Sequence, residues 1–145
     1  MPRQIRTFTY TSPEYKQALA LRYRILRKPL GLQFTEAELK KDEDDIHFGL
    51  FEGDKIIVCL TLTKAGNGRM KMRQVAVDNV SQGKGLGSEL SLAAEKFALE
   101  NGCKVMFCHA RKAATPFYLK LGYRIIGDEF TEVNIPHYQM EKELV

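Results

Sequence analysis

Hydrophobic and polar residues follow two different periods along the chain, which predict a mixture of strands and helices. Seven short stretches are rich in β-branched and aromatic residues and are bounded by turn-forming residues, a pattern typical of strands. We expect strands at residues 4–10, 47–52, 55–64, 70–78, 104–109, 123–128 and 138–142. Turn residues such as Gly53-Asp54 join neighbouring stretches and indicate hairpins.

Capping residues mark where we expect helices to begin. Ser12 followed by Pro13 is typical of a helix start, and Thr35-x-x-Glu38 matches a capping box. The expected helices cover residues 13–27, a short segment after Thr35, residues 85–100 and residues 113–121. Between them, the acidic run at residues 41–45 is expected to be a solvated turn.

The order of the elements predicts the fold class. On the helix at residues 85–100, the helical period places Leu86, Leu90, Ala93 and Phe97 on one face. Strands and helices together predict an α/β (α+β) fold around a mixed sheet. No repeat, linker or low-complexity tract divides the chain, so residues 1–145 are expected to form a single domain.

Composition argues against several classes of function. Lys and Arg number 22 against 18 Asp and Glu, which gives a net charge of +4 and a pI of about 9.0, but they are scattered. A nucleic-acid-binding surface usually concentrates them, so no nucleic-acid partner is expected. Because the sequence contains no signal peptide and no apolar stretch long enough to span a bilayer, we expect a cytoplasmic protein without membrane contact.

Cysteine and histidine spacing gives no sign of a metal site. Cys59, Cys103 and Cys108 lack C-x-x-C spacing, and their odd number argues against a disulfide framework. The three histidines are likewise not spaced as zinc ligands. We therefore expect no metal.

Residues 82–88, Gln-Gly-Lys-Gly-Leu-Gly-Ser, are the most informative segment. They follow an expected strand and open an expected helix, where glycines allow close backbone approach and helix N–H groups suit phosphate. Ser88 stands where a dinucleotide-binding G-x-G-x-x-G motif needs its last glycine, and Lys84 lacks the following Ser or Thr of a P-loop. We interpret the segment as another kind of pyrophosphate-binding loop; a flexible turn entering the helix is the alternative.

Two signatures, in order, resemble those of the GNAT family of acetyltransferases. Gln82-x-x-Gly85-x-Gly87 is similar to the family's Q/R-x-x-G-x-G/A motif, and residues 73–77 match the strand that precedes it. Residues 114–123 resemble the later A-x-x-F-Y-x-x-x-G-F/Y signature. The closing segment, residues 127–140, is similar to the ElaA-like branch of the family.

The resemblance implies a mixed, mostly antiparallel central sheet with helices on both faces. It also implies an N-acetyltransferase that uses acetyl-CoA as co-substrate, with the pantetheine arm between splayed fourth and fifth strands, along Val75, Ala76 and Val77. The implied pyrophosphate loop comprises Gln82, Gly83, Lys84, Gly85, Leu86, Gly87 and Ser88, and the second signature adds Thr115 and Phe117.

The implied chemistry is attack of a neutral amine on the thioester, with a backbone N–H near Ala76 stabilising the oxyanion. Tyr118 matches the family tyrosine that protonates the leaving thiolate; a core aromatic is its alternative role. Histidine titrates in the range useful for a base, and we assign this role to His137 as a hypothesis. A histidine bonded to a backbone carbonyl is the alternative, and His109 is a candidate to orient substrate. Glu132 is either a carboxylate that binds a cationic amine or a solvated loop charge.

The acceptor is specified only as a small amine or a peptide. Arg22, Arg24, Phe34 and the acidic run are candidates to shape its site. A non-catalytic module that senses acyl-CoA is the rival of the enzyme, and a homodimer is compatible with either.

Overall fold

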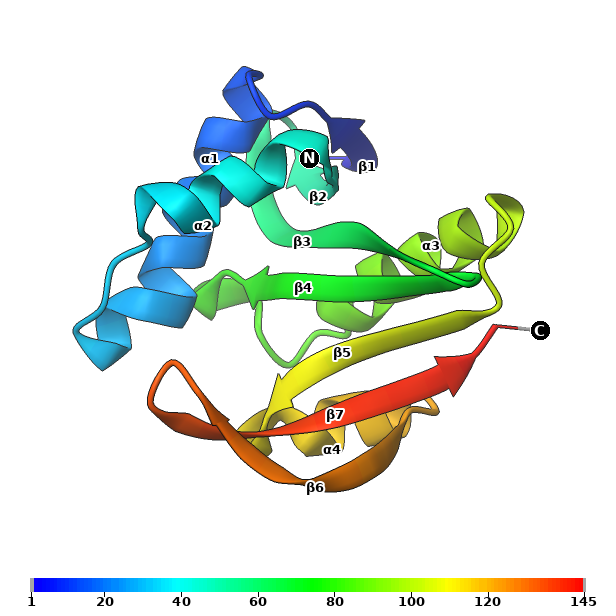
Figure 1. The fold of residues 1–145 in the computed structure, drawn as a ribbon. Coiled ribbons are helices and arrows are strands. Elements are labelled where there is room, and N and C mark those ends of the chain that lie inside the picture. Colours follow the sequence, from blue (N-terminus) through cyan, green and yellow to red (C-terminus); the bar gives the residue numbers. More distant parts are fainter. Residues whose placement is uncertain (1, 145) are drawn as a thin grey trace.

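Strand pairing builds one seven-stranded sheet in the order β1-β2-β3-β4-β5-β7-β6, as the computed structural model shows for residues 2–144 (Figure 1). The strands are β1 (Arg3–Phe8), β2 (Ile46–Glu52), β3 (Lys55–Gly66), β4 (Arg69–Val77), β5 (Val105–Arg111), β6 (Arg124–Glu132) and β7 (Ile135–Glu143). The helices are α1 (Pro13–Arg22), α2 (Glu36–Lys40), α3 (Leu86–Glu100) and α4 (Thr115–Lys120). All strand pairs are antiparallel except β4–β5, so the expected mixed, mostly antiparallel sheet is confirmed.

The parallel pair β4–β5 is the shortest junction in the sheet. Its register covers only Arg69 to Lys71 opposite Val105 to Phe107. Beyond these residues β4 continues to Val77 and β5 to Arg111 without pairing to each other. The two strands therefore diverge, and their unpaired edges line an opening in the middle of the sheet.

Local capping signals fix the helix starts as expected. The hydroxyl of Ser12 accepts a hydrogen bond from the N–H of Tyr15 at 3.2 Å. Thr35 and Glu38 form the reciprocal capping box at the start of α2.

The helical path expected over residues 13–27 has the right extent but not a uniform geometry. After α1 ends, Tyr23–Arg27 forms a π-helix. Such turns are rare and occur often at functional sites, and the 3.6-residue period does not reveal them. This π-helical segment brings Leu26 and Arg27 to the opening between β4 and β5.

Two hydrophobic cores lie on opposite faces of the sheet. On one face, α1 packs Tyr15, Ala18 and Leu21 against residues such as Phe51 of β2. On the other face, α3 and α4 cover a larger core, with Leu90 and Tyr118 among its members (Figure 1). Helices on both faces are thus confirmed.

The buried face of α3 differs by one position from the expected one. Leu86, Leu90, Ala94 and Ala98 are buried, whereas Ala93 is only partly covered. The placement of Ala93 on the core face was wrong, because successive steps of four residues from Leu86 lead to Ala94. Phe97 packs against the edge of this core, with its ring 5.3 Å from that of Phe48.

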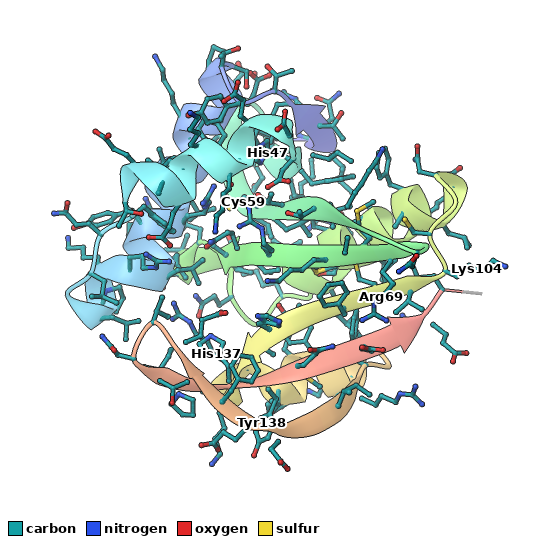
Figure 2. All side chains as sticks on the ribbon, in the orientation of Figure 1. His47, Cys59, Arg69, Lys104, His137 and Tyr138 are labelled. Carbon is teal, nitrogen blue, oxygen red and sulfur yellow. The ribbon has the colours of Figure 1, made fainter. Side chains whose placement is uncertain are left out.

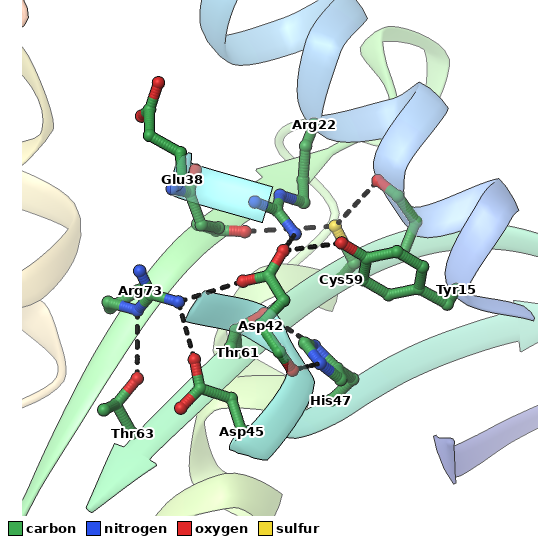
Figure 3. A network of polar contacts seen from close by, with 12 residues as sticks. Tyr15, Arg22, Glu38, Asp42, Asp45, His47, Cys59, Thr61, Thr63 and Arg73 are labelled. Atoms are coloured by element: carbon green, nitrogen blue, oxygen red, sulfur yellow. Dashed lines mark hydrogen bonds and ion pairs between the residues drawn. The ribbon is translucent and has the colours of Figure 1, made fainter. Parts of the chain in front are cut away.

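The acidic run at residues 41–45 is not a solvated turn, so that expectation was wrong. Asp42 is completely buried, and its carboxylate accepts hydrogen bonds from Tyr15 (2.6 Å), Arg22 (2.8 Å) and Arg73 (3.0 Å) (Figure 3). Arg73 also pairs with Asp45 at 2.7 Å. Side chains of α1 and β4 supply enough hydrogen-bond donors to stabilise the buried carboxylates of Asp42 and Asp45.

The backbone of Asp42 connects strand β2 to the same network. Its carbonyl accepts a hydrogen bond from Nε2 of His47 at 2.8 Å, and Nδ1 of that ring faces the Thr61 hydroxyl at 3.0 Å. Burial lowers the pKa of His47, which keeps the ring neutral. Asp42 therefore joins α1, β2 and β4 in one buried network.

We expect Asp42→Ala to lower the free energy of unfolding by about 3–5 kcal/mol, because Arg22 would remain buried without its partner. Urea denaturation of both proteins measures this change. Asp44→Ala is the matched control, since Asp44 is an exposed carboxylate in the same run. Equal unfolding midpoints for the two variants would show that Asp42 does not anchor the fold.

Candidate functional site

A pocket with a volume of ≈ 360 Å³ lies at the opening between β4 and β5. Its walls come from both strands, α4, the β6–β7 turn and the π-helical segment. His137 lies at this end of the sheet and Lys104 at the opposite end (Figure 2). The pocket brings together Val75, Tyr118 and His137, which sequence reasoning had selected separately.

A β-bulge distorts β4 beside this pocket. The register with β3 shifts between Cys59 and Thr61, where β4 carries one extra residue. Gln74 adopts a left-handed backbone with φ of 57°, which a residue other than glycine adopts only at a cost in energy. Strain of this kind gathers at functional sites, and the bulge redirects the backbone just before Val75.

Alternation along β4 decides which backbone groups face the opening. The N–H of Asp78 donates to the carbonyl of Ile57 on β3 at 2.8 Å. Because neighbouring residues point to opposite sides, Ala76 also faces β3, whereas the carbonyl of Val75 and both backbone groups of Val77 face the opening. Val75 and Val77 can therefore meet a ligand there, while the expected N–H of Ala76 is directed to the neighbouring strand.

The glycine loop presents a row of free backbone donors. Gly83 and Gly85 have φ of 80° and 77°, and Gly85 is the N-cap of α3. Within residues 2–144, the N–H groups of residues 83–88 donate to no backbone or side-chain acceptor. Consecutive free donors at a helix N-terminus form an anion-binding surface.

Close packing holds this loop against the second signature. A Cβ atom on Gly87 would lie 3.1 Å from Val77 and 3.3 Å from the ring of Phe117, so any side chain there would require these neighbours to shift by a few tenths of an ångström. The amide of Gln82 donates to the carbonyl of Val77 at 3.1 Å and thus ties the loop to β4. The Thr115 hydroxyl donates to the Lys112 carbonyl at 2.9 Å.

Tyr118 is buried in the wall of the pocket. Its ring packs against Phe117 and Tyr123 at centroid distances of 5.0 and 5.6 Å. Burial raises the pKa of the Tyr118 hydroxyl, and the nearby Cys108 thiol raises it further. The phenol therefore stays protonated at neutral pH, as a proton donor must.

His137 is held in one orientation at the pocket wall. It is 3% exposed, its Nδ1 lies 3.0 Å from the carbonyl of Ile135, and its ring stacks on Phe130. A carbonyl can only accept, so Nδ1 carries the proton. The Nε2 atom lies 3.7 Å from Glu132 and is free to accept a proton.

Glu132 connects the two pocket histidines. It ends β6 at a two-residue turn, Val133-Asn134, in which both residues have positive φ. Its carboxylate lies 3.1 Å from Nδ1 of His109, which in turn lies 3.4 Å from the ammonium of Lys71. The expected loop carboxylate is thus part of a polar cluster in the pocket.

Sequence reasoning missed the cationic side chains of this pocket. Burial lowers the pKa of the Lys71 ammonium, partly offset by Glu132. Arg27 pairs with Glu38 at 2.6 Å and lowers the pKa of that carboxyl to about 2. Lys71 and Arg73 alternate with buried methionines along β4, a period-two pattern that could have revealed a polar face toward the opening.

Within residues 2–144, no helix is long and apolar enough to cross a membrane. In the same residues, no group of three or more His, Cys, Asp or Glu side chains is arranged to hold a metal ion.

Known proteins share both sequence and fold with this chain. The sequence model of a family described as "Acetyltransferase (GNAT) domain" matches residues 14–144. The uncharacterized N-acetyltransferase YjcF of Bacillus subtilis (strain 168) is 28% identical over 136 residues, which cover 90% of this chain and 93% of YjcF.

Two solved structures are similar at lower identity. Escherichia coli ElaA, whose branch the closing segment resembles, has a TM-score of 0.85 and 16% identity, covering 98% of this chain and 100% of ElaA. The PaiA N-acetyltransferase from Thermoplasma acidophilum, solved in complex with coenzyme A, has a TM-score of 0.76 and 15% identity over 99% of each chain. At such identities the likeness establishes a common fold.

We expect the neutral ring of His137 to carry its proton on Nδ1. Nitrogen-15 NMR at about pH 9, where an ordinary imidazole is uncharged, distinguishes the two tautomers. His47 is the internal control with the opposite tautomer, because its Nε2 faces a carbonyl. A proton found on Nε2 of His137 would remove this atom as a base.

Proposed function

The chain belongs to the GNAT acetyltransferase family, and on this premise we propose that its single domain transfers the acetyl group of acetyl-CoA to a primary amine. The observation that carries the proposal is the row of free N–H groups at residues 83–88. This row stands beside the open edge of β4, where, within residues 2–144, the carbonyl of Val75 and the N–H of Val77 have no partner and the carbonyl of Val77 accepts from Gln82. A long ligand with an anionic head and an amide-bearing arm fits both features.

In the proposed complex, the loop amides hold the pyrophosphate of acetyl-CoA. The positive end of the α3 dipole adds to their attraction, and the Lys84 side chain is exposed and free to add charge. The backbone of Val75 and Val77 then pairs with the pantetheine amides between β4 and β5. The bound arm would lead the thioester toward the pocket that contains Tyr118 and His137.

The proposed reaction is direct attack of the amine on the thioester carbonyl. The nitrogen lone pair forms the new C–N bond, the carbon–sulfur bond breaks as the oxyanion collapses, and the nitrogen loses one N–H proton to solvent. Tyr118 gives its proton to the departing sulfur and regains one from solvent. The bulged segment of β4, which lines the pocket at Gln74 and Val75, is the source we assign to the backbone donor for the oxyanion.

His137 is the base we propose for the incoming ammonium. Its Nε2 is the accepting atom, and the Ile135 carbonyl fixes the ring so that this atom points to Glu132. Glu132 would attract the ammonium before the proton leaves. A sensor that only binds acyl-CoA is the competing function, and it would bind acetyl-CoA without ever releasing free CoA in the presence of an amine.

We expect Gly85→Glu to weaken acetyl-CoA binding at least about tenfold, because its carboxylate would repel the pyrophosphate. Calorimetric titration with acetyl-CoA measures the dissociation constant. Gly66→Glu is a closely matched control: Gly66 has φ of 78° against 77° at Gly85, and neither position has an atom within 4 Å of a new Cβ. Equal affinities of the two variants, or a well-folded parent that does not bind, would reject the cofactor site.

We expect Tyr118→Phe to lower kcat about a hundredfold or more while the KM for acetyl-CoA stays unchanged, since only the proton donor is lost. Thiol release with an accepted amine gives both constants. Tyr123→Phe is the control, because it removes another buried hydroxyl from the same cluster, one that bonds to Glu95 instead of facing the pocket. A Tyr118→Phe enzyme with the parent kcat would assign the proton donor elsewhere.

A further inference from the structure

The acceptor end of the pocket carries an excess of positive charge. Five cationic side chains line it, namely Arg27, Lys41, Lys71, Arg73 and Arg111, against the two carboxylates Glu38 and Glu132. Two of the arginines are already neutralised, because Arg27 pairs with Glu38 and Arg73 with Asp42 and Asp45. Among the described lining residues, this leaves three cations, Lys41, Lys71 and Arg111, and a single carboxylate, Glu132.

Arg111 is a half-buried cation with few partners in the protein. Among residues 2–144, its guanidinium meets no carboxylate and donates only to the carbonyl of Leu26. It is half-buried, and burial together with the neighbouring Arg27 lowers the pKa of Arg111. A guanidinium has five N–H donors in a fork that matches carboxylate and phosphate oxygens, so most of its binding capacity is unused.

The pyrophosphate of acetyl-CoA does not account for this charge. The loop at residues 83–88 supplies its own donors, and none of its residues lines the pocket. Arg111 instead lines the pocket and donates across the opening to the carbonyl of Leu26 in the π-helical segment. An anion bound by Arg111 would therefore belong to the second substrate.

We infer that the acceptor is an amine that also carries an oxyanion group, a carboxylate or a phosphate, and that Arg111 binds this group. This inference rests on the proposed acetyl transfer and names the substrate class of the same site. Lys41 and Lys71 raise the local positive potential and so favour such acceptors over polyamines or lysine-rich peptides. Glu132, next to both histidines, is the carboxylate left to receive the amine end.

The acceptor test compares amines that differ only in charge. Alanine is paired with alaninamide, phosphoethanolamine with ethanolamine, and spermidine represents polycations, with thiol release as the readout. We expect the anionic member of a pair to have a kcat/KM about tenfold or more above its neutral partner, and the pair that responds separates carboxylate from phosphate. Preference for neutral amines or spermidine would overturn the inference.

Substitution of Arg111 locates the effect. In Arg111→Gln we expect the KM for the anionic acceptor to rise about tenfold or more with an unchanged KM for acetyl-CoA, and Arg111→Lys to recover part of the loss. Arg124→Gln is the control, because Arg124 is exposed and lies opposite Glu141, at the far end of β7 from His137. Equal loss of kcat for neutral and anionic amines in Arg111→Gln would assign Arg111 to the oxyanion of the reaction and overturn its role in acceptor binding.

A binding experiment tests the proposed acceptor class even if none of these amines reacts. Acetate and inorganic phosphate are titrated into the CoA-saturated, nitrogen-15-labelled protein while the backbone amide signals of the pocket residues, present in every variant, are followed together with the Arg111 side-chain Nε–H signal. Saturable shifts that Arg111→Gln abolishes and Arg124→Gln retains support the inference, and their absence overturns it. Calorimetry with acetyl-CoA on the same samples is independent: failure to bind acetyl-CoA rejects the proposed function, whereas binding without any oxyanion response rejects only the acceptor class.

Discussion

The buried carboxylate of Asp42 is the interaction on which the geometry of the site depends. Removing a carboxylate from water costs several kcal/mol, and the cost is offset only if every lone pair finds a good donor. Here Tyr15, Arg22 and Arg73 supply those donors from α1 and β4. Since Arg73 directly precedes the bulge at Gln74, the network also fixes the strand where its backbone turns toward the opening.

The site comprises the pocket and the glycine loop, and each of its groups has a role set by its element. The α3 N-terminus supplies donors for an anion, the open edge of β4 supplies backbone groups, and α4 and β7 place Tyr118 and His137 on the wall. The end of β6 contributes Glu132 from far along the chain. Because the strands part only after Lys71, all these groups converge at one end of the sheet.

Much of this arrangement could be predicted from the sequence because its determinants are local. The Ser12 cap, the capping box at Thr35 and the glycines before α3 each specify their own neighbourhood, and the sheet follows from the two signatures. Three features depend on distant partners and were missed. Asp42 is buried only because α1 and β4 provide donors, the π-helical segment is contacted at the Leu26 carbonyl by Arg111 from β5, and the cations of the pocket meet only when the strands are assembled.

Because β4 and β5 pair over only three residues, bound acetyl-CoA would have a structural role as well as a chemical one. In the proposed complex the pantetheine arm stands between the two strands and completes the sheet as a missing strand would. Ligands that bind only the folded state stabilise it in proportion to their concentration. The concentration of acetyl-CoA would then set the stability of the contact between strands β1–β4 and strands β5–β7. The folded enzyme would be most stable where acetyl-CoA is abundant.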